Sequence, residues 1–362
     1  MGVYVIDTAA LKSNIDICKR TVGQLKIYAV LKGNGYGLGL LPYSRILRAE
    51  GLTAFAVNET GDVEKLRADG FSGEILMLHS TSNSKEIQRL LDADAVFSIG
   101  SAEAYEALNQ AASQSEKKVQ AHLYVDMGMG REGFDVWDRE NLCAICQHQG
   151  CVAVAGIYTH FPSAENPEDT KIRFSGFMNL VEFLHGMGWA GTVHCANSCI
   201  ALHYPEMRLD AVRIGSGFLG RLPLNISEEL GLQTIGYIET EIASTKWLVP
   251  GDTLGYGCAF KARRKTEIGT LNIGYYNGFG TERTVNMSSP KDYMRAMLTP
   301  AKALLRGTKK TASVNGNTVP LVGCVGMQNA FLDITDCPGK AHDKVVLQCN
   351  PLLVRNLDIE FR

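Results

Sequence analysis

From residue 26 onward, short apolar runs alternate with longer segments in which apolar residues recur at helical spacing. The runs are rich in Val, Ile, Ala, Phe and Tyr, which is typical of β-strands. Two of them, 27–31 and 152–158, are almost continuously apolar, as expected for parallel strands buried on both faces. The pattern predicts eight strands, at 26–32, 54–59, 74–79, 95–99, 120–126, 152–160, 192–197 and 211–217.

Helical segments lie between these runs. Residues 60–69 follow a possible N-cap at Thr60 and end before Gly70, while residues 170–187 carry four apolar side chains at i, i+3, i+4 and i+7 spacing. Eight strand-and-helix units within about 200 residues favour an α/β fold of the (β/α)8 TIM-type barrel. An open doubly wound sheet is the alternative.

The alternation of predicted strands and helices ends near residue 225. Beyond it come β-like runs without long amphipathic helices between them, at 236–247, 266–275, 301–306, 318–327, 330–335 and 344–348. We therefore expect a barrel over 6–228 and a mostly antiparallel C-terminal β domain over 229–362, with residues 1–5 as a possible further strand of the β domain.

Composition narrows the class of protein. The 362 residues are 45% hydrophobic and 20% charged, with a net charge of −2. These values are typical of a globular protein and point away from nucleic acid and membrane partners. The ten cysteines are scattered, so we expect them to stay reduced in a cytoplasmic protein. Cys143 and Cys146 form one C-x-x-C without a second pair, so we expect no metal site.

Chemically useful side chains follow several of the predicted strands. Because the carboxyl ends of barrel strands meet at one rim, these residues are expected to converge there. A lysine at the end of a buried strand is expected to be desolvated, which favours the neutral, nucleophilic amine. The residues in question are Lys32, Arg131, His160, Asn197, Ser198, Arg213, Gly215 and Ser216.

The segment after the eighth strand suggests an anion site. The N–H groups of Gly215 and Ser216, together with the Ser198 hydroxyl, are placed to hold a phosphate. A lysine, a phosphate cradle and an arginine for a ring nitrogen describe a pyridoxal phosphate site. Two G-x-G-x-x-G segments, at 128–133 and 215–220, are weak signals for dinucleotide binding because neither has the strand and helix context of that motif.

The motifs resemble those of the alanine racemase family, the fold type III pyridoxal phosphate enzymes, over nearly the whole chain. The segments that carry the resemblance are AVLKGNGYGLG, HLYVDMGMGREGF, GIYTHF, HCANS, VRIGSGFLG, GDTLGYG, IGYYNGFG and VGCVGMQNAFLDIT. The resemblance implies an isomerase that interconverts L- and D-amino acids, with alanine as the default substrate and serine or another amino acid as variants.

The resemblance also implies roles for individual residues. In the cofactor site, Lys32 attaches pyridoxal phosphate, Tyr36 and Ser198 contact its phosphate, His160 stacks on its ring, and Arg213 faces its pyridine nitrogen. Arg131 and Met327 are implied to bind the substrate carboxylate, with Tyr275 and Gln328 nearby. Family members are homodimers in which Tyr256 and Met327 act in the partner's site.

Racemisation removes a proton from one face of Cα and returns one to the other, so two opposed bases suffice. The resemblance assigns these bases to Lys32 and to Tyr256 of the partner subunit. A phenol is mostly protonated at neutral pH, so Tyr256 needs positive neighbours, and His160 or Arg131 are the candidates.

The chain departs from the family pattern around the expected substrate. Tyr124 stands where many members carry a lysine that becomes carbamylated and steers the arginine, so Asp126, an anion or the Tyr124 hydroxyl is left to position Arg131. Leu38, Asn277 and Gln328 also replace residues usual in the family, and the tail lacks the usual phosphate-binding tyrosine. A lyase on the same fold (a D-amino-acid aldolase or decarboxylase) and a non-catalytic pyridoxal phosphate homeostasis protein are the alternative functions.

Overall fold

The computed structural model describes residues 2–148, 150–223, 225–281, 293–294, 298, 310–337 and 339–362. The chain divides into two compact units, one formed by Thr8–Ile235 and the other by Met1–Asp7 together with Gly236–Arg362. The sequence analysis placed this boundary between residues 228 and 229.

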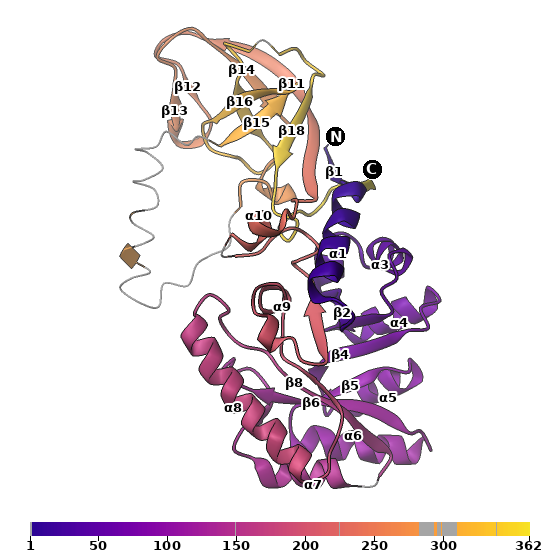
Figure 1. Ribbon diagram of the computed structural model, residues 1–362. Helices are drawn as coiled ribbons and strands as arrows, with labels where there is room; N and C mark the ends of the chain where they lie inside the picture. The colour runs from indigo at the N-terminus through magenta and orange to yellow at the C-terminus, as the bar shows by residue number, and fades with distance from the viewer. Residues whose placement is uncertain are drawn as a thin grey trace. The chain divides into compact units, whose positions relative to one another are not determined.

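The first unit is a parallel β-barrel with helices around it (Figure 1). Its strands follow the order β10-β2-β3-β4-β5-β6-β8-β9, and a parallel bridge between Ala196 and Val212 leads from the β9 side back to β10. The sheet therefore nearly closes on itself, which confirms the predicted barrel. The strands are β2 (Lys26–Val30), β3 (Ala54–Val57), β4 (Glu74–Ser80), β5 (Val96–Ile99), β6 (Val119–Asp126), β7 (Phe134–Asp135), β8 (Val152–Thr159), β9 (Thr192–His194) and β10 (Ala211–Ile214).

The helices of this unit connect successive strands. They are α1 (Thr8–Val22), α2 (Lys32–Tyr36), α3 (Leu40–Ala49), α4 (Thr60–Ala68), α5 (Ser84–Asp92), α6 (Ala102–Gln114), α7 (Arg139–Gln147), α8 (Pro167–Gly186), α9 (Ser198–His203), the 3-10 turn η1 (Pro205–Met207) and α10 (Ile226–Leu230). Helix α8 begins before the predicted 170 because Asn166 caps it by accepting the Asp169 N–H and Pro167 occupies the first turn. Thr60 is the first residue of α4 rather than its N-cap.

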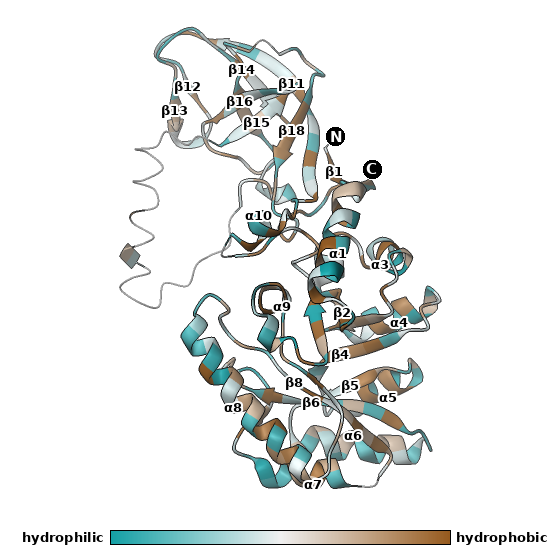
Figure 2. Cartoon of the chain, in the orientation of Figure 1, coloured by the Kyte–Doolittle hydropathy of each residue, from teal (hydrophilic) through white to brown (hydrophobic). Residues whose placement is uncertain are grey.

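Burial explains why the strands could be recognised in the sequence as apolar runs. Every residue of β3, β5 and β10 is buried, because barrel strands are covered by interior side chains on one face and helices on the other. Helices α1 and α8 alternate between hydrophilic and hydrophobic residues along their ribbons (Figure 2). These helices therefore cover the barrel with one face and meet water with the other.

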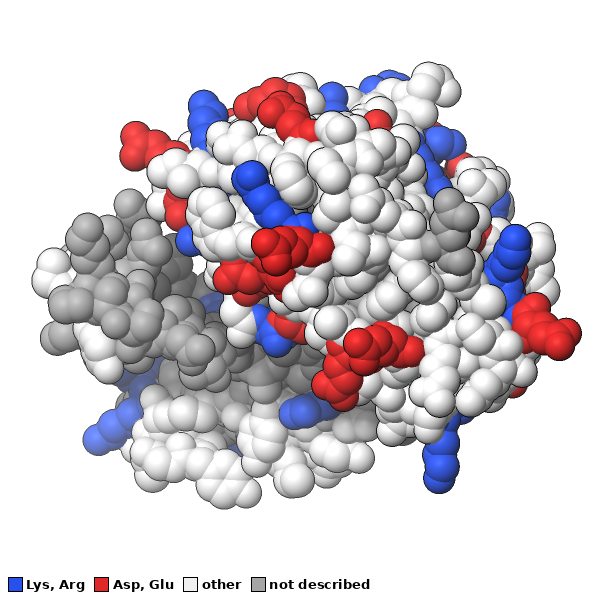
Figure 3. All heavy atoms as spheres, turned by 90° about the horizontal axis from the view of Figure 1, so that it is seen from below, with Lys and Arg blue, Asp and Glu red and all other residues white. Residues whose placement is uncertain are grey.

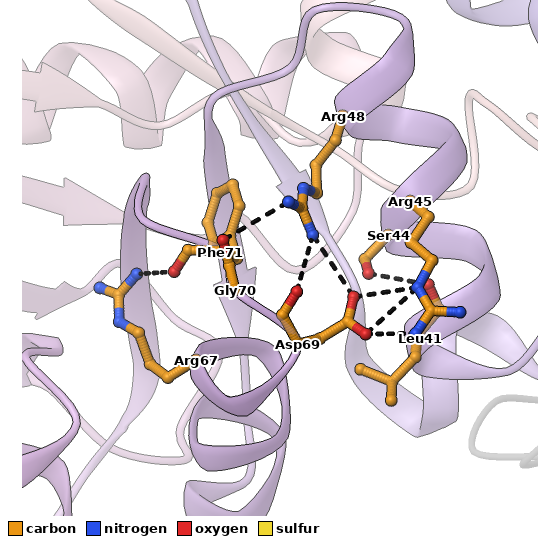
Figure 4. A network of polar contacts seen from close by, with 8 residues as sticks. All are labelled: Leu41, Ser44, Arg45, Arg48, Arg67, Asp69, Gly70 and Phe71. Atoms are coloured by element: carbon orange, nitrogen blue, oxygen red, sulfur yellow. Dashed lines mark hydrogen bonds and ion pairs between the residues drawn. The ribbon is translucent and has the colours of Figure 1, made fainter.

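Arginine side chains tie the helices together where α3 and α4 end (Figure 4). Arg45 and Arg48 both contact the Asp69 carboxylate just after α4. Arg67 donates to four backbone carbonyls, those of Phe71 (2.7 Å), Gly73 (2.7 Å), Ala93 (2.9 Å) and Asp94 (2.8 Å). One guanidinium thus satisfies the ends of two helices and the entrance to β4.

The second unit is a mostly antiparallel β-sheet. Its main sheet follows the order β14-β17-β16-β15-β18-β11-β1-β19, in which β1 and β19 run parallel and the other neighbours among the described strands run antiparallel. The elements are β1 (Val3–Ile6), β11 (Gly236–Leu248), β12 (Thr253–Leu254), η2 (Tyr256–Cys258), β13 (Phe260–Lys261), β14 (Thr266–Leu271), η3 (Tyr275–Asn277), β15 (Thr311–Val314), β16 (Asn317–Val322), β17 (Ala330–Asp333), β18 (Lys344–Gln348) and β19 (Asp358–Phe361). The predicted strand at 301–306 lies outside the described residues.

Lys, Arg, Asp and Glu side chains are interspersed on the face shown in Figure 3, without a large area of one sign. Among the described residues, no helix combines the length and apolar character that crossing a bilayer requires.

We predict that Arg67→Ala lowers the free energy of unfolding by about 1–3 kcal/mol, because four carbonyls lose their shared donor. Arg67→Lys should recover only part of this, since one ammonium cannot reach all four carbonyls. Urea unfolding followed by circular dichroism measures the change. The control is Arg45→Ala, which removes an exposed ion pair and should have a much smaller effect; equal losses in both variants would contradict the assignment.

Candidate active site

A cavity of about 360 Å³ opens at the carboxyl ends of the barrel strands. All of its lining residues belong to the first unit, and they come from the ends of β2, β3, β4, β6, β8, β9 and β10. Each residue of the barrel that the sequence analysis selected lines it, namely Lys32, Tyr36, Arg131, His160, Asn197, Ser198, Arg213, Gly215 and Ser216.

The turn that follows β2 is left-handed. Gly33, Asn34 and Gly35 have φ values of 63°, 53° and 64°, and Tyr36 continues with 56°. Hydrogen bonds from the Gly35 and Gly37 N–H groups to the carbonyls four residues earlier hold this turn. Glycine tolerates this conformation and other L-residues rarely adopt it, which explains the glycine-rich sequence here.

The turn corrects one expectation about Lys32. Strand β2 ends at Val30 rather than at residue 32, so Lys32 belongs to the turn and its side chain is exposed toward the cavity mouth. Burial in a strand therefore does not activate this lysine. Its position on the cavity wall, beside other cationic groups, is what distinguishes it.

Tyr36, Ser198 and Gly215 form a tight cradle on one side of the cavity. A Cβ built on Gly215 would lie 2.3 Å from the Tyr36 hydroxyl oxygen, so only glycine allows this approach. The Gly215 N–H donates to Ser198 Oγ (2.9 Å). The Ser198 O–H and the Ser216 N–H are then two donors of the cradle that can bind an anion. The sequence analysis had expected the Gly215 N–H to bind the anion directly, but this group is used in the bond to Ser198.

Arg213 is a buried cation on the cavity wall, with 4% of its surface exposed. Its terminal nitrogens contact His194 Nδ1 (2.7 Å), the Thr159 carbonyl (2.7 Å) and, at longer range, the carbonyls of residues 194 and 195. Its guanidinium also lies over the Tyr158 ring. Burial lowers the pKa of Arg213, but a guanidinium stays protonated. These neutral partners therefore leave a net positive charge at the cavity.

The arginine fixes the protonation of two buried histidines. Because a guanidinium cannot accept a hydrogen bond, His194 Nδ1 must be unprotonated and Nε2 carries the proton. Nε2 then donates to Nδ1 of His122 (2.8 Å). Burial and the charge of Arg213 lower the pKa of His194 well below its usual value, and burial lowers that of His122 to about 4. Both rings are therefore neutral at pH 7, and neither places a charge beside Arg213.

His160 follows β8 and lies on the same cavity wall. Burial, together with the positive charges of Arg213, Lys32 and Arg131, lowers its pKa to about 3. The neutral ring cannot supply the positive charge that the sequence analysis considered for Tyr256. The neutral ring can still bind a flat ligand by stacking its aromatic face on it.

Arg131 stands in the loop that follows β6. The Asp126 carboxylate accepts the N–H groups of Gly128 (3.0 Å), Met129 (2.7 Å) and Gly130 (2.8 Å), so it shapes this loop. Gly133, with φ of 117°, then turns the chain back so that β7 pairs with β6. The loop brings the Arg131 side chain to the cavity.

The remaining predicted residues belong to the second unit. Tyr256 lies in η2 and is 80% exposed, and Tyr275, Met327 and Gln328 are exposed too. The Tyr275 N–H donates to the Gly326 carbonyl (3.0 Å), and the Tyr276 N–H donates to the Met327 carbonyl (3.0 Å). The structure thus brings the Tyr275 and Met327 segments together within this unit.

Sequence reasoning missed three residues beside the cavity. Tyr158 lines it, and His194 holds Arg213. Asn58, at the end of β3, lines it with a buried amide oxygen that has no hydrogen-bond partner among the described residues. Each is a polar or aromatic side chain in an otherwise apolar strand or directly after it, which is the signal that was available.

The barrel residues present fit pyridoxal phosphate. The cradle closed by Gly215 suits a phosphate, Arg213 offers a buried positive charge, and Lys32 offers an amine on the same cavity wall. The cavity volume lies within the range of cofactor pockets. Among the described residues, no cluster of metal-ligating side chains is present.

Comparison with known proteins agrees with this fold and gives the class of protein, a barrel-type amino-acid racemase, which is an isomerase. The family model for the alanine racemase N-terminal domain matches residues 6–223, and the model for the alanine racemase C-terminal domain matches residues 235–356. The chain belongs to the alanine racemase family.

Two relatives illustrate the range of the family. A broad specificity amino-acid racemase from Vibrio vulnificus is 31% identical over 345 residues, which cover 92% of this chain and 77% of that protein. An alanine racemase from Desulforamulus reducens is 30% identical over 355 residues, covering 94% and 88%. The fold also matches the crystal structure of alanine racemase from Bartonella henselae with covalently bound pyridoxal phosphate, with a TM-score of 0.79, 20% identity and coverage of 100% and 99%.

We predict that His160 makes the protein sensitive to acid. Below about pH 6.5 the unfolded chain protonates this histidine, whereas the folded chain excludes the proton until about pH 3, so folding stability falls as pH falls. In protein stripped of small-molecule ligands, His160→Gln should lose about 2–3 kcal/mol less stability than wild type between pH 7 and pH 4.5. Urea unfolding at several pH values measures this. The exposed His203→Gln is the matched control, and a parallel pH dependence in wild type and His160→Gln would contradict the prediction.

Proposed function

We propose that this protein is a pyridoxal phosphate-dependent racemase of free amino acids, with alanine as the default substrate and serine or another amino acid as variants. One observation supports it above the others. A buried arginine that pairs with no carboxylate among the described residues, the cradle of Tyr36, Ser198 and Gly215, and a lysine all line one cavity of a racemase-family barrel.

The barrel residues would hold the cofactor in distinct ways. The Ser198 hydroxyl, the Ser216 N–H, Tyr36 and Asn197 would hold its phosphate, while Arg213 would face its ring nitrogen and His160 its ring. Lys32 would attach it covalently. Bound pyridoxal phosphate supplies an electron sink that makes the Cα proton of an amino acid acidic enough to remove.

Lys32 and Tyr256 would act as the two bases. Lys32 would exchange a proton at one face of Cα through Nζ, and the Tyr256 hydroxyl of the partner subunit would do so at the other. The high exposure of Tyr256 within its own unit supports a role outside that unit. A homodimer with shared sites, as the family resemblance implies, is therefore part of the proposal.

Tyr256 needs a cation to act as a base near neutral pH. Since His160 is neutral, Arg131 is the remaining candidate among the two that the sequence suggested. Arg131 would also bind the substrate carboxylate, together with the Met327 N–H of the partner subunit. Gln328 and Tyr275 would border the substrate side chain, so they are where we expect specificity to be set.

Arg213 would influence the reaction because its guanidinium does not transfer a proton to the cofactor's ring nitrogen. A guanidinium at the ring nitrogen leaves that nitrogen unprotonated, which weakens the electron sink. A weaker sink favours return of the proton to Cα over its transfer elsewhere, as a racemase requires.

The cysteines are consistent with a cytoplasmic location, which we include in the proposal. None of the ten cysteines forms a disulfide, and three of them are buried in the barrel. Free thiols persist in a reducing compartment.

We predict that Lys32→Ala abolishes the visible absorption band that appears when wild-type protein is mixed with pyridoxal phosphate, because the amine that attaches the cofactor is gone. Absorption spectra of the dialysed proteins measure this. Lys85→Ala removes an exposed lysine of α5 and should keep the band. A band of undiminished height in Lys32→Ala would refute the role of Lys32.

We predict that the wild type exchanges the Cα hydrogen of at least one of the twenty standard amino acids with deuterium, and that the products include both enantiomers. Tyr256→Phe should slow racemisation by about 10²–10⁴-fold, because one of the two bases is lost. NMR of the substrate in D₂O and chiral chromatography measure the two effects.

Tyr276→Phe, which removes the hydroxyl of another exposed tyrosine of the same unit, is the control for Tyr256→Phe. Glycine plus an aldehyde, or carbon dioxide, as the main product would favour a lyase. Cofactor binding without exchange of any amino acid would favour the non-catalytic alternative.

A further inference from the structure

The position of Tyr124 raises the question of what orients Arg131, and the inference below rests on the proposed function. The family resemblance places a carbamylated lysine, a negative group, at this position. Tyr124 is 1% exposed and stacks on Tyr158 at 4.8 Å between ring centroids. Burial raises the pKa of its phenol although the nearby Arg131 guanidinium opposes the rise, so Tyr124 stays neutral. Its hydroxyl interacts with the Arg131 guanidinium without reaching good hydrogen-bond geometry, and a neutral phenol supplies no negative charge there.

Among the described residues, Asp126 forms no ion pair with Arg131, whose ion pair is with Glu132. Its two carboxylate oxygens accept three N–H groups from residues 128, 129 and 130. These bonds use the carboxylate to hold the loop backbone. An acid engaged in this way shapes the loop that carries Arg131 but does not direct the guanidinium.

Glu132 is the carboxylate that forms an ion pair with Arg131 among the described residues. Its Oε1 lies 3.6 Å from Arg131 Nε. Its Oε2 accepts the Ser80 N–H at the end of β4 (3.1 Å) and lies 3.4 Å from His79 Nδ1. The Glu132 side chain is 21% exposed, against 56% for Arg131. The acid is therefore the better fixed member of the pair.

The backbone around Glu132 is fixed as well. A Cβ on Gly133 would lie 2.8 Å from the Asp126 N atom, and a Cβ on Gly100, just after β5, would lie 3.1 Å from the Gly133 N atom. The segment is thus packed between the ends of β5 and β6. Ser80, which binds Glu132, also accepts the Gly100 N–H through its hydroxyl (2.9 Å).

We propose that Glu132 is the positioning residue of Arg131. Its carboxylate, anchored to the end of β4, supplies the fixed negative charge that a carbamylated lysine supplies elsewhere in the family, and it holds the guanidinium ready for the substrate carboxylate. Glu132 does not touch the reacting atoms. It acts only through Arg131.

The test uses the cofactor-loaded protein and Glu132→Gln, which keeps the acceptor for the Ser80 N–H and removes the charge. The non-reacting probe is propionate, and its affinity is read from the change in the visible absorption of the cofactor. We expect propionate to bind about three- to fivefold more weakly and the KM of the amino acid to rise by a similar factor, with a smaller change in kcat. The control is Glu86→Gln, which removes a partly buried carboxylate that binds Thr60 and should change neither value.

A double-mutant cycle separates positioning from a structural role. In an Arg131→Lys background, Glu132→Gln should weaken propionate binding by less than about twofold, because lysine lacks the planar guanidinium that the acid orients. Equal effects in both backgrounds would show that Glu132 merely holds the loop. Tighter propionate binding by Glu132→Gln would also overturn the proposal, since removing a negative charge near Arg131 without an effect on its orientation favours the anion.

A further readout requires neither cofactor nor turnover. Glu132→Gln should raise the rate at which a dicarbonyl reagent modifies Arg131, followed by peptide mass spectrometry, because the guanidinium is no longer held against the acid. An unchanged rate would contradict the proposal. Faster modification in a protein that racemises no amino acid would leave Glu132 as the partner of Arg131 and would overturn only the proposed function.

Discussion

The buried guanidinium of Arg213 is the constraint on which the rest of the barrel interior depends. A charge removed from water needs compensation, and here it comes from lone pairs of His194 and of backbone carbonyls rather than from an acid. The consequence is that His194 and His122 are held neutral in defined tautomers, and His160 is neutral too. The charge is not cancelled, so it is available to an electron-rich ring atom at the cavity.

Much of this arrangement could be predicted from the sequence because parallel barrel strands are buried on both faces and read as apolar runs. Once the strands were placed, topology alone brought residues such as Lys32, His160 and Arg213 to one rim. The environment of Lys32 could not be predicted in the same way. The apolar run ends at Leu31, but the hydrogen-bonded strand ends at Val30, because the glycines that follow enter a left-handed turn.

Contacts between strands distant in the sequence were beyond such reasoning. His194 is one polar residue in an apolar segment, and nothing local shows that it meets Arg213. Glu132 is read locally as the neighbour of Arg131, yet its function depends on Ser80, which belongs to β4 and comes near only because the sheet places the ends of β4, β5 and β6 side by side. Residues whose role depends on a partner's position need the fold before they can be interpreted.

The two arginines of the cavity therefore require different partners for physical reasons. Arg213 is fully buried, so a carboxylate beside it would cancel the charge that its position provides. Arg131 is more than half exposed, so water competes with any neutral partner for its guanidinium. If Tyr124 stands in place of a carbamylated lysine, as the family resemblance implies, one negative charge is lost, and in our proposal the glutamate one residue after the arginine restores it. The acid side chain is shorter than a carbamylated lysine, and its position next to Arg131, on a backbone held by Gly133, places its Oε1 3.6 Å from Arg131 Nε.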